Sequence, residues 1–176
     1  MPVTASIEIA APPSTVRAKV RLQSPSRITL TNPNPQFLDF PSLPTYHTTF
    51  FKSIVPLSPT DPLSPTQKLR VDFGGMKMDA VILANSPHLF KWGGSLPLIF
   101  GGNHSFEFKE SKVTPGGTTF TQHEEFYGAL GFLMGGNFVG RWAGFGRKTE
   151  GNWDGFNRDL KGVCEKEVEG GNGAVR

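Results

Sequence analysis

The chain has 176 residues, a formal net charge of +3 and 37% hydrophobic residues, with 18 Lys and Arg against 15 Asp and Glu. This length predicts one domain that buries enough apolar surface to fold without metals or disulfides, and the single cysteine cannot close an intramolecular bridge. The weak, scattered positive charge argues against a nucleic-acid partner, and no apolar run reaches the roughly 18 residues that stable membrane insertion needs. With no signal-peptide pattern at the start, the expected location is the cytoplasm.

The first predicted elements are a short strand and a helix. Polar and apolar residues alternate over residues 6–9, which is typical of a strand, and a pair of prolines ends the pattern. Ser14 then provides a suitable N-cap for a helix over residues 15–19. No helical or strand period is held over residues 20–36, which contain three prolines and no acidic residue.

Strand-like runs separated by Pro or Gly clusters follow, as in an antiparallel meander. They cover residues 47–55, 68–73, 76–85, 88–92, 103–109 and 118–127. Gly74 and Gly75 lie between two of these runs and indicate a hairpin or a bulge. The glycine pairs at 93–94 and 101–102 are interpreted as turns, because they lack the Lys-Ser/Thr of a phosphate-binding loop and do not precede a helix.

A closing helix is predicted over residues 152–168, where apolar residues recur at three- and four-residue steps. Residues from 170 onward are expected to form a flexible tail. The order of elements predicts an α+β fold in which a curved antiparallel sheet of about six or seven strands wraps around a long C-terminal helix. A helix does not completely fill a wide concave surface, so a cavity is the expected by-product.

Three segments resemble the START-like, or SRPBCC, superfamily. Ile7-Glu8-Ile9-Ala10-Ala11-Pro12-Pro13 resembles its opening, and residues 118–128 resemble the last strand and following turn of its polyketide cyclase/dehydrase-like members. Residues 155–161 are similar to the closing helix of the superfamily. The resemblance implies a helix-grip fold, a single ligand-binding domain over residues 1–169, and a hydrophobic pocket like that of coenzyme Q-binding-protein-like START domains. The activities it implies range from lipid transport to ring closure.

The segment 20–36 interrupts this resemblance, since joining residue 19 to residue 37 restores the pattern of the superfamily's first helix and next turn. One hypothesis is a Pro-rich surface loop. The other is a translated short intron of fungal type, because 17 residues correspond to 51 nucleotides that can start with GT and end with AG. An exposed, poorly ordered insertion is expected in either case.

Strand alternation assigns candidate ligand-binding side chains to faces of the sheet. In residues 118–127 the two phenylalanines share a face with Gln122 and Glu124, and the same reasoning groups the aromatic and methionine side chains of the other strands. An apolar cavity with a few convergent polar groups is the usual form of a small-molecule site. The predicted ligand-binding residues are Met76, Met78, Phe90, Trp92, Phe106, Phe108, Phe120, Gln122, Phe126, Met134, Trp153 and Phe156.

Two of the polar residues are candidates for catalysis. Glu124 among aromatic side chains is suited to general acid or base chemistry, and His104 to hydrogen bonding with a ligand carbonyl or to proton transfer. The alternatives are that Glu124 faces water or pairs with Arg or Lys, and that His104 bonds a backbone carbonyl or lies at the pocket mouth. His47 and His123 are expected to be surface or packing residues. The four scattered histidines and one cysteine predict neither a metal site nor a cofactor.

Three classes of function remain open. The first is a binder or carrier of a hydrophobic small molecule such as a lipid, a quinone or a polyketide-like compound. The second is an enzyme of the polyketide cyclase or dehydratase type. The third is a co-chaperone resembling activators of the Hsp90 ATPase, although the sequence indicates no particular protein partner.

Overall fold

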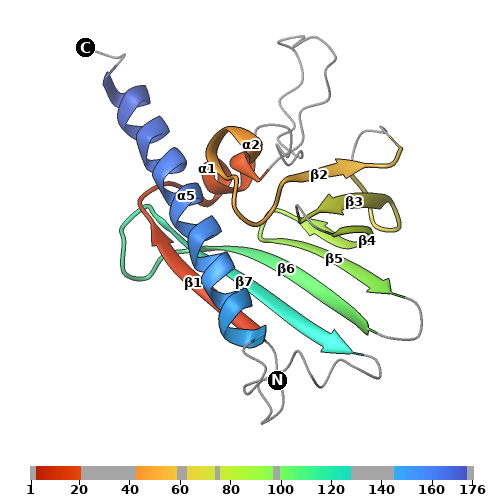
Figure 1. Cartoon of the computed structure of the whole chain (residues 1–176). Coiled ribbons are helices and arrows are strands. Elements are labelled where there is room, and N and C mark those ends of the chain that lie inside the picture. Colours follow the sequence, from red (N-terminus) through yellow and green to blue (C-terminus); the bar gives the residue numbers. More distant parts are fainter. Residues whose placement is uncertain are drawn as a thin grey trace.

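The computed structural model of the chain describes residues 3–20, 43–58, 63–73, 76–96, 100–127 and 145–173 (Figure 1). Within these ranges the strands form one seven-stranded antiparallel sheet in the order β1-β7-β6-β5-β4-β3-β2. The strands are β1 Val3–Ile9, β2 Ser53–Pro56, β3 Lys68–Asp72, β4 Lys77–Ser86, β5 Leu89–Leu96, β6 Phe100–Glu110 and β7 Thr118–Tyr127, and the helices are α1 Pro13–Lys19, α2 Leu43–Tyr46 and α5 Phe145–Gly173. The predicted α+β fold with a curved sheet and a C-terminal helix is confirmed.

The sheet is a meander with the first strand added at one edge. β2 to β7 pair in sequence order, and β1 pairs with β7, so that the first and last strands lie side by side. Figure 1 shows α5 crossing one face of the curved sheet, with α1 and α2 beside it. We call the sheet face covered by α5 the inner face. The predicted alternation on β7 is correct, since Phe120 and Gln122 are fully buried while Thr119 and Thr121 are partly exposed.

Aromatic rings fill much of the space between the inner face and α5. The rings of Phe106 and Phe120 stack with centroids 6.0 Å apart, and Phe156 of α5 contacts Phe106 at 6.1 Å. Phe51, in the segment before β2, meets Phe156 edge-on at 5.4 Å. Each such buried side chain contributes on the order of 1.5–3 kcal/mol. The apolar stripe of α5 that the three- and four-residue spacing predicts is the surface that packs here.

The predicted strand over residues 47–55 is mostly wrong. Only Ser53–Pro56 is a strand, and it is preceded by the short helix α2 and an irregular segment. His47 explains the difference, because its buried ring accepts a hydrogen bond from the backbone N–H of Phe50 at 3.0 Å. This local contact occupies a backbone donor that a longer strand would use for pairing.

The interpretation of the two glycine pairs as turns is also wrong. Gly93 and Gly94 lie within β5, Gly101 and Gly102 lie within β6, and Gly94 pairs directly with Gly102. A Cβ atom on Gly102 would lie 2.5 Å from Oε1 of Glu124. Glycine inside a strand often marks a close approach of another group, and here it makes room for a carboxylate.

The closing helix is longer than predicted. α5 begins at Phe145 and ends at Gly173, whereas the expected range is 152–168 and the tail is expected from residue 170. Glycines weaken an isolated helix, but burial of Trp153, Phe156 and Leu160 against the sheet offsets that cost. No helix in the described ranges is long and apolar enough to cross a membrane.

Val20 is buried at the end of α1, and the rest of the predicted insertion over residues 20–36 lies outside the described residues. The insertion and the division into a domain over residues 1–169 and a tail therefore stay predictions.

Candidate functional site

The two candidate catalytic residues, His104 and Glu124, form a pair. They are direct partners in the antiparallel register of β6 and β7, which places both side chains on the inner face. Nδ1 of His104 lies 2.7 Å from Oε2 of Glu124. The His104 side chain is 1% exposed and that of Glu124 is 14% exposed, so the pair runs from the interior toward solvent. Glu124 thus pairs with a histidine rather than with the Arg or Lys considered from the sequence.

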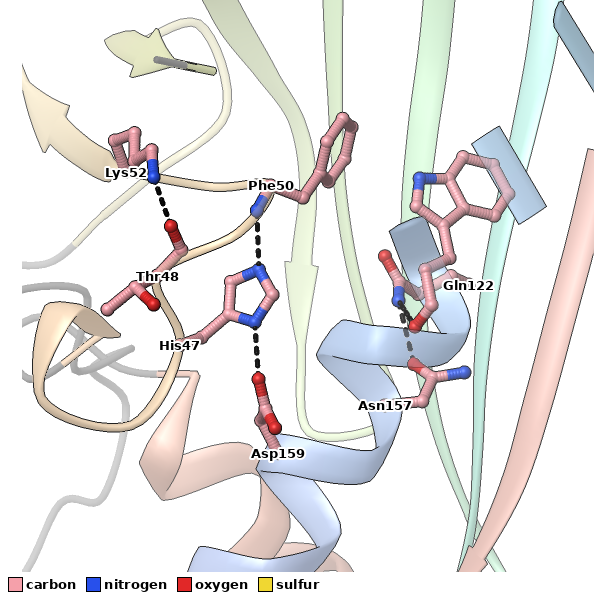
Figure 2. Close-up of polar contacts among 8 residues, drawn as sticks. His47, Thr48, Phe50, Lys52, Gln122, Asn157 and Asp159 are labelled. Atoms are coloured by element: carbon pink, nitrogen blue, oxygen red, sulfur yellow. Dashed lines mark hydrogen bonds and ion pairs between the residues drawn. The ribbon is translucent and has the colours of Figure 1, made fainter. Parts of the chain in front are cut away.

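A chain of hydrogen bonds extends this pair to α5. Nε2 of His104 lies 3.2 Å from Oε1 of Gln122, and Nε2 of Gln122 donates to Oδ1 of Asn157 at 2.7 Å. Figure 2 shows Gln122 on β7 and Asn157 on α5 pointing toward each other. Gln122 and Asn157 are 0% and 1% exposed. We call Glu124, His104, Gln122 and Asn157 the polar chain.

The orientation of Gln122 indicates which hydrogen bonds His104 makes. Its Nε2 faces two oxygen atoms, Oδ1 of Asn157 and the backbone carbonyl of Trp153 at 3.5 Å, so its Oε1 faces His104. A ring nitrogen facing an oxygen acceptor must carry hydrogen, and the short contact to Glu124 also holds one. His104 therefore donates from Nε2 to Gln122, and one hydrogen lies between its Nδ1 and the Glu124 carboxyl group.

Aromatic side chains enclose His104. The ring of Trp92, its direct partner on β5, stacks on the imidazole with centroids 5.1 Å apart and planes 22° apart. Trp153 of α5 meets the imidazole edge-on at 5.1 Å, and Phe106 does so at 4.6 Å. The site is therefore a polar pair inside an aromatic shell.

Three buried hydrogen-bond donors near His104 lack an acceptor in the described part of the chain. They are Nε1 of Trp92, Nε1 of Trp153 and Nδ2 of Asn157. An unpaired buried polar group costs about 1–3 kcal/mol, and native proteins keep few of them. These donors therefore need an explanation that the packing of the described residues does not supply.

The structure gathers most of the predicted ligand-binding residues in this interior. The fully buried ones are Phe90, Trp92, Phe106, Phe108, Phe120, Gln122, Trp153 and Phe156. Met78 and Phe126 are partly buried against the same side chains. Met76, which precedes β4, is 44% exposed, so the structure does not place it among the interior residues. Met134 lies outside the described residues.

Sequence reasoning missed Asn157 and Phe51. Asn157 follows Trp153 by four residues, a spacing that puts both on one side of a helix, and this signal was available in the sequence. Phe51, whose ring lies 5.9 Å from that of His104, had no such signal because it belongs to an irregular segment. The pairing of His104 with Glu124 depends on the strand register, which the sequence did not provide.

His47 forms a second buried polar contact. Its Nε2 accepts from the Phe50 N–H, so its Nδ1 carries the hydrogen and donates to Oδ2 of Asp159 at 2.8 Å, as Figure 2 shows. The ring also meets Phe156 edge-on at 5.1 Å. Nδ1 thus attaches the segment before β2 to α5, while Nε2 bonds to the backbone of that same segment. This is the packing role expected of His47, while His123 accepts or donates a hydrogen bond with Thr4 at the other face of the sheet.

No group of three or more His, Cys, Asp and Glu side chains within the described ranges is arranged to hold a metal ion. The lone Cys164 is fully buried in α5, and burial raises the pKa of its thiol to about 12. A thiol with so high a pKa is a poor nucleophile at neutral pH.

The fold and the site together define a helix-grip domain with a polar chain inside an aromatic interior. Several solved structures share this fold. A hypothetical protein from Helicobacter pylori, jhp0584, aligns with a TM-score of 0.64 at 9% identity over 93% of this chain and 88% of the other. Ara h 8.0201 aligns with a TM-score of 0.54 at 10% identity over 93% and 97% of the two chains. No protein-family model and no curated protein sequence matches the chain.

The di-domain ARO/CYC StfQ from the steffimycin biosynthetic pathway aligns with a TM-score of 0.61 at 13% identity. The match covers 96% of this chain and 53% of StfQ, so the chain spans about half of that protein. At these identities the likeness shows the fold. The helix-grip fold that the sequence resemblance implies is confirmed.

Proposed function

We propose that the protein binds a hydrophobic small molecule, of the lipid, quinone or polyketide-like class, between the inner face of the sheet and α5. The observation that carries this proposal is the polar chain enclosed by aromatic side chains. Small-molecule sites are mostly apolar with a few convergent polar groups, and His104, Gln122 and Asn157 supply such groups here. A core that served packing alone would use apolar residues at these positions.

The position of Glu124 suggests where a ligand enters. Its side chain is 14% exposed while its partner His104 is 1% exposed, so the polar chain reaches solvent at the Glu124 end. The described aromatic rings elsewhere on the inner face contact one another. A ligand that reaches His104 therefore displaces or repacks some of these side chains, which glycine-lined strands such as β5 and β6 make easier.

Two measurements test this proposal. Native mass spectrometry of the protein purified from its own host is expected to show a bound small molecule that is released on denaturation. The ligand-free protein is then titrated with the fluorescent probe 1-anilinonaphthalene-8-sulfonate, for which we expect saturable one-to-one binding by folded protein. Circular dichroism confirms that the protein stays folded. An empty protein that binds no probe would overturn the proposal.

Two substitutions that each shorten an apolar side chain, one buried and one exposed, locate the bound probe. Phe120→Leu changes a fully buried ring on the inner face and is expected to weaken probe binding at least threefold. Leu83→Ala changes a side chain that is 46% exposed and serves as the control, with binding unchanged. If Leu83→Ala weakens binding and Phe120→Leu does not, the probe binds the outer surface and the proposed location is wrong.

The second candidate function is ring closure of a poly-β-ketone, which the hydrogen-bonded pair of His104 and Glu124 favours. Glu124 as carboxylate takes a proton from a methylene carbon between two carbonyls, and that carbon forms a bond to a second carbonyl carbon. His104 as imidazolium gives a proton to the resulting alkoxide oxygen. Transfer of one proton across the 2.7 Å contact restores the pair, so the step is a balanced aldol addition that needs no oxidant.

The single substitutions Glu124→Gln and His104→Ala separate the two candidates. A binder keeps its affinity within about threefold in Glu124→Gln. An enzyme still binds but loses on the order of 100-fold or more in turnover of the N-acetylcysteamine thioester of a linear poly-β-ketone, because one general acid or base is lost. Cyclisation at equal rates in the wild type and both variants would eliminate the enzymatic candidate.

A further inference from the structure

The interior around His104 contains hydrogen-bond donors of one kind. The indole N–H groups of Trp92 and Trp153 are donors only, since an indole nitrogen has no lone pair available to accept. Both nitrogens are buried and have no acceptor in the described part of the chain, as is the case for Nδ2 of Asn157. These groups would each bond to an oxygen atom, and none of them can bond to an ammonium or another donor.

The two tryptophans approach His104 from different elements. Trp92 lies opposite His104 in the pairing of β5 with β6, and its ring stacks on the imidazole at 5.1 Å. Trp153 comes from α5, and its ring meets the imidazole edge-on, also at 5.1 Å. Asn157 lies one helical turn after Trp153 and joins the polar chain through Gln122. Two of the unpaired donors thus belong to rings that contact the imidazole, and the third is joined to it through Gln122.

We propose that this region is a subsite for an acceptor oxygen of the ligand, so that the bound molecule is a planar aromatic ketone, quinone or phenolate and not an amine or a plain hydrocarbon. The inference rests on the proposed function and specifies the class of ligand. The aromatic rings of Trp92, Phe106 and Trp153 supply the flat apolar surface for such a molecule, and the unpaired N–H groups supply the donors.

The hydrogen bonds of His104 agree with this polarity. Its Nε2 donates to Oε1 of Gln122, so this nitrogen is a further donor at the centre of the subsite. A carbonyl or phenolate oxygen can accept from such groups, whereas an ammonium group cannot. The carboxylate of Glu124 lies at the solvent side of the imidazole, where its side chain is partly exposed.

A pair of ligands that differ by one oxygen tests the subsite. 9-Fluorenone and fluorene have the same ring system, and only fluorenone presents a carbonyl. Equilibrium dialysis measures both affinities without relying on tryptophan fluorescence. We expect the wild-type protein to bind fluorenone about tenfold more tightly than fluorene, since each hydrogen bond to a buried donor is worth roughly threefold to tenfold in affinity.

Substitutions at the two tryptophans test whether the indole donors cause the preference for fluorenone over fluorene. Trp92→Phe and Trp153→Phe remove one N–H each and keep an aromatic ring, so each is expected to lower the fluorenone preference about threefold or more. Phe90→Leu is the control, because it alters a fully buried ring without a donor and should change both affinities by the same factor. In the wild type, the indole N–H resonances of both tryptophans should shift downfield on addition of fluorenone and not on addition of fluorene.

The outcomes keep the two proposals separate. If neither fluorenone, fluorene nor the anilinonaphthalene probe binds, the proposed function itself is wrong. If fluorene and fluorenone bind equally well and the indole resonances respond to both alike, the protein is a hydrophobic binder without an acceptor-oxygen subsite, and this inference is overturned. The wild-type comparison decides this point even if a tryptophan variant fails to fold.

Discussion

From the hydrogen bonds of the polar chain we expect Gln122→Leu to lower stability in a way that packing alone would not produce. Gln122→Leu replaces the central member by an apolar side chain of similar size. It leaves the N–H at Nε2 of His104 and Oδ1 of Asn157 without their partner, and both residues are 1% exposed. Neither group can turn to solvent, so the loss is not screened by water.

The size of the effect follows from these two groups. An unpaired buried polar group costs about 1–3 kcal/mol, so two of them cost ~4 kcal/mol at the middle of that range. Burial of the leucine methyl groups offsets ~1 kcal/mol. We therefore expect the free energy of unfolding to fall by ~3 kcal/mol, which lowers the melting temperature by roughly 6–12 °C for a chain of this size.

A combined variant tests whether the loss comes from unpaired groups. His104→Phe, Gln122→Leu and Asn157→Leu together remove three of the four members, and only Glu124, which is partly exposed, remains. Replacing all buried partners by apolar groups is often neutral, so this variant is expected to recover to within ~1 kcal/mol of the wild type. Urea unfolding followed by circular dichroism measures both variants.

His47 provides the matched control for this experiment, because it is the other buried histidine that joins the sheet side to α5. His47→Phe leaves the Phe50 N–H unpaired, and adding Asp159→Asn should not restore stability, since Asp159 is 42% exposed and is solvated without its partner. If the combined variant of the polar chain loses the sum of its single losses, the chain contributes to stability and the reasoning is refuted.

Two further predictions concern Cys164 and Gly102. The pKa of Cys164 is raised from 9.0 to about 12 by burial, so its unfolded form loses a proton near pH 9 while the folded form keeps it. The free energy of unfolding should then fall with pH above 9 by up to ~1.4 kcal/mol per pH unit. Cys164→Ala should remove this part of the slope in alkaline urea titrations. An equal slope in the variant and the wild type would contradict the prediction. Gly102→Ala should move the Glu124 carboxylate, because the added Cβ lies 2.5 Å from its Oε1, and should shift the His104 ring resonances with a change in stability below ~1 kcal/mol. Gly94→Ala, where the added Cβ meets the end of Met78 at 2.6 Å, is the control that should leave those resonances in place.

The sequence predicted the fold well where one signal dominates. The clean alternation over residues 118–127 predicted the bounds and the buried face of β7, and the turn signals predicted the meander of the later strands but not the pairing of β1 with β7. The errors occurred where side chains of distant residues decide the local structure. The His47 side chain bonds to the backbone N–H of Phe50 and bends the chain before β2. Gly102 lies within β6 rather than in a turn, and the absence of a Cβ atom there leaves room for the Glu124 carboxylate.

The candidate site could be predicted residue by residue but not as an arrangement. Alternation placed His104 and Glu124 on faces of their own strands, and yet the 2.7 Å contact between them depends on a register in which the two residues are direct partners. A shift of one residue would put one of them on the other face of the sheet. The contribution of α5, above all Asn157, needs the position of the helix as well as its spacing.

The position of Glu124 separates the two candidate functions most directly. The indole donors around His104 would suffice to hold an acceptor oxygen, so a binder needs no carboxylate beside that imidazole. The chain nevertheless gives Glu124 a partner at 2.7 Å and a glycine that makes room for it, and it leaves the carboxylate partly exposed, where it can exchange protons with solvent. These features suit the transfer of a proton and are not needed to hold a ketone. Loss of proton transfer with retained fluorenone affinity in Glu124→Gln would therefore favour the enzyme, and unchanged chemistry in that variant would favour the binder.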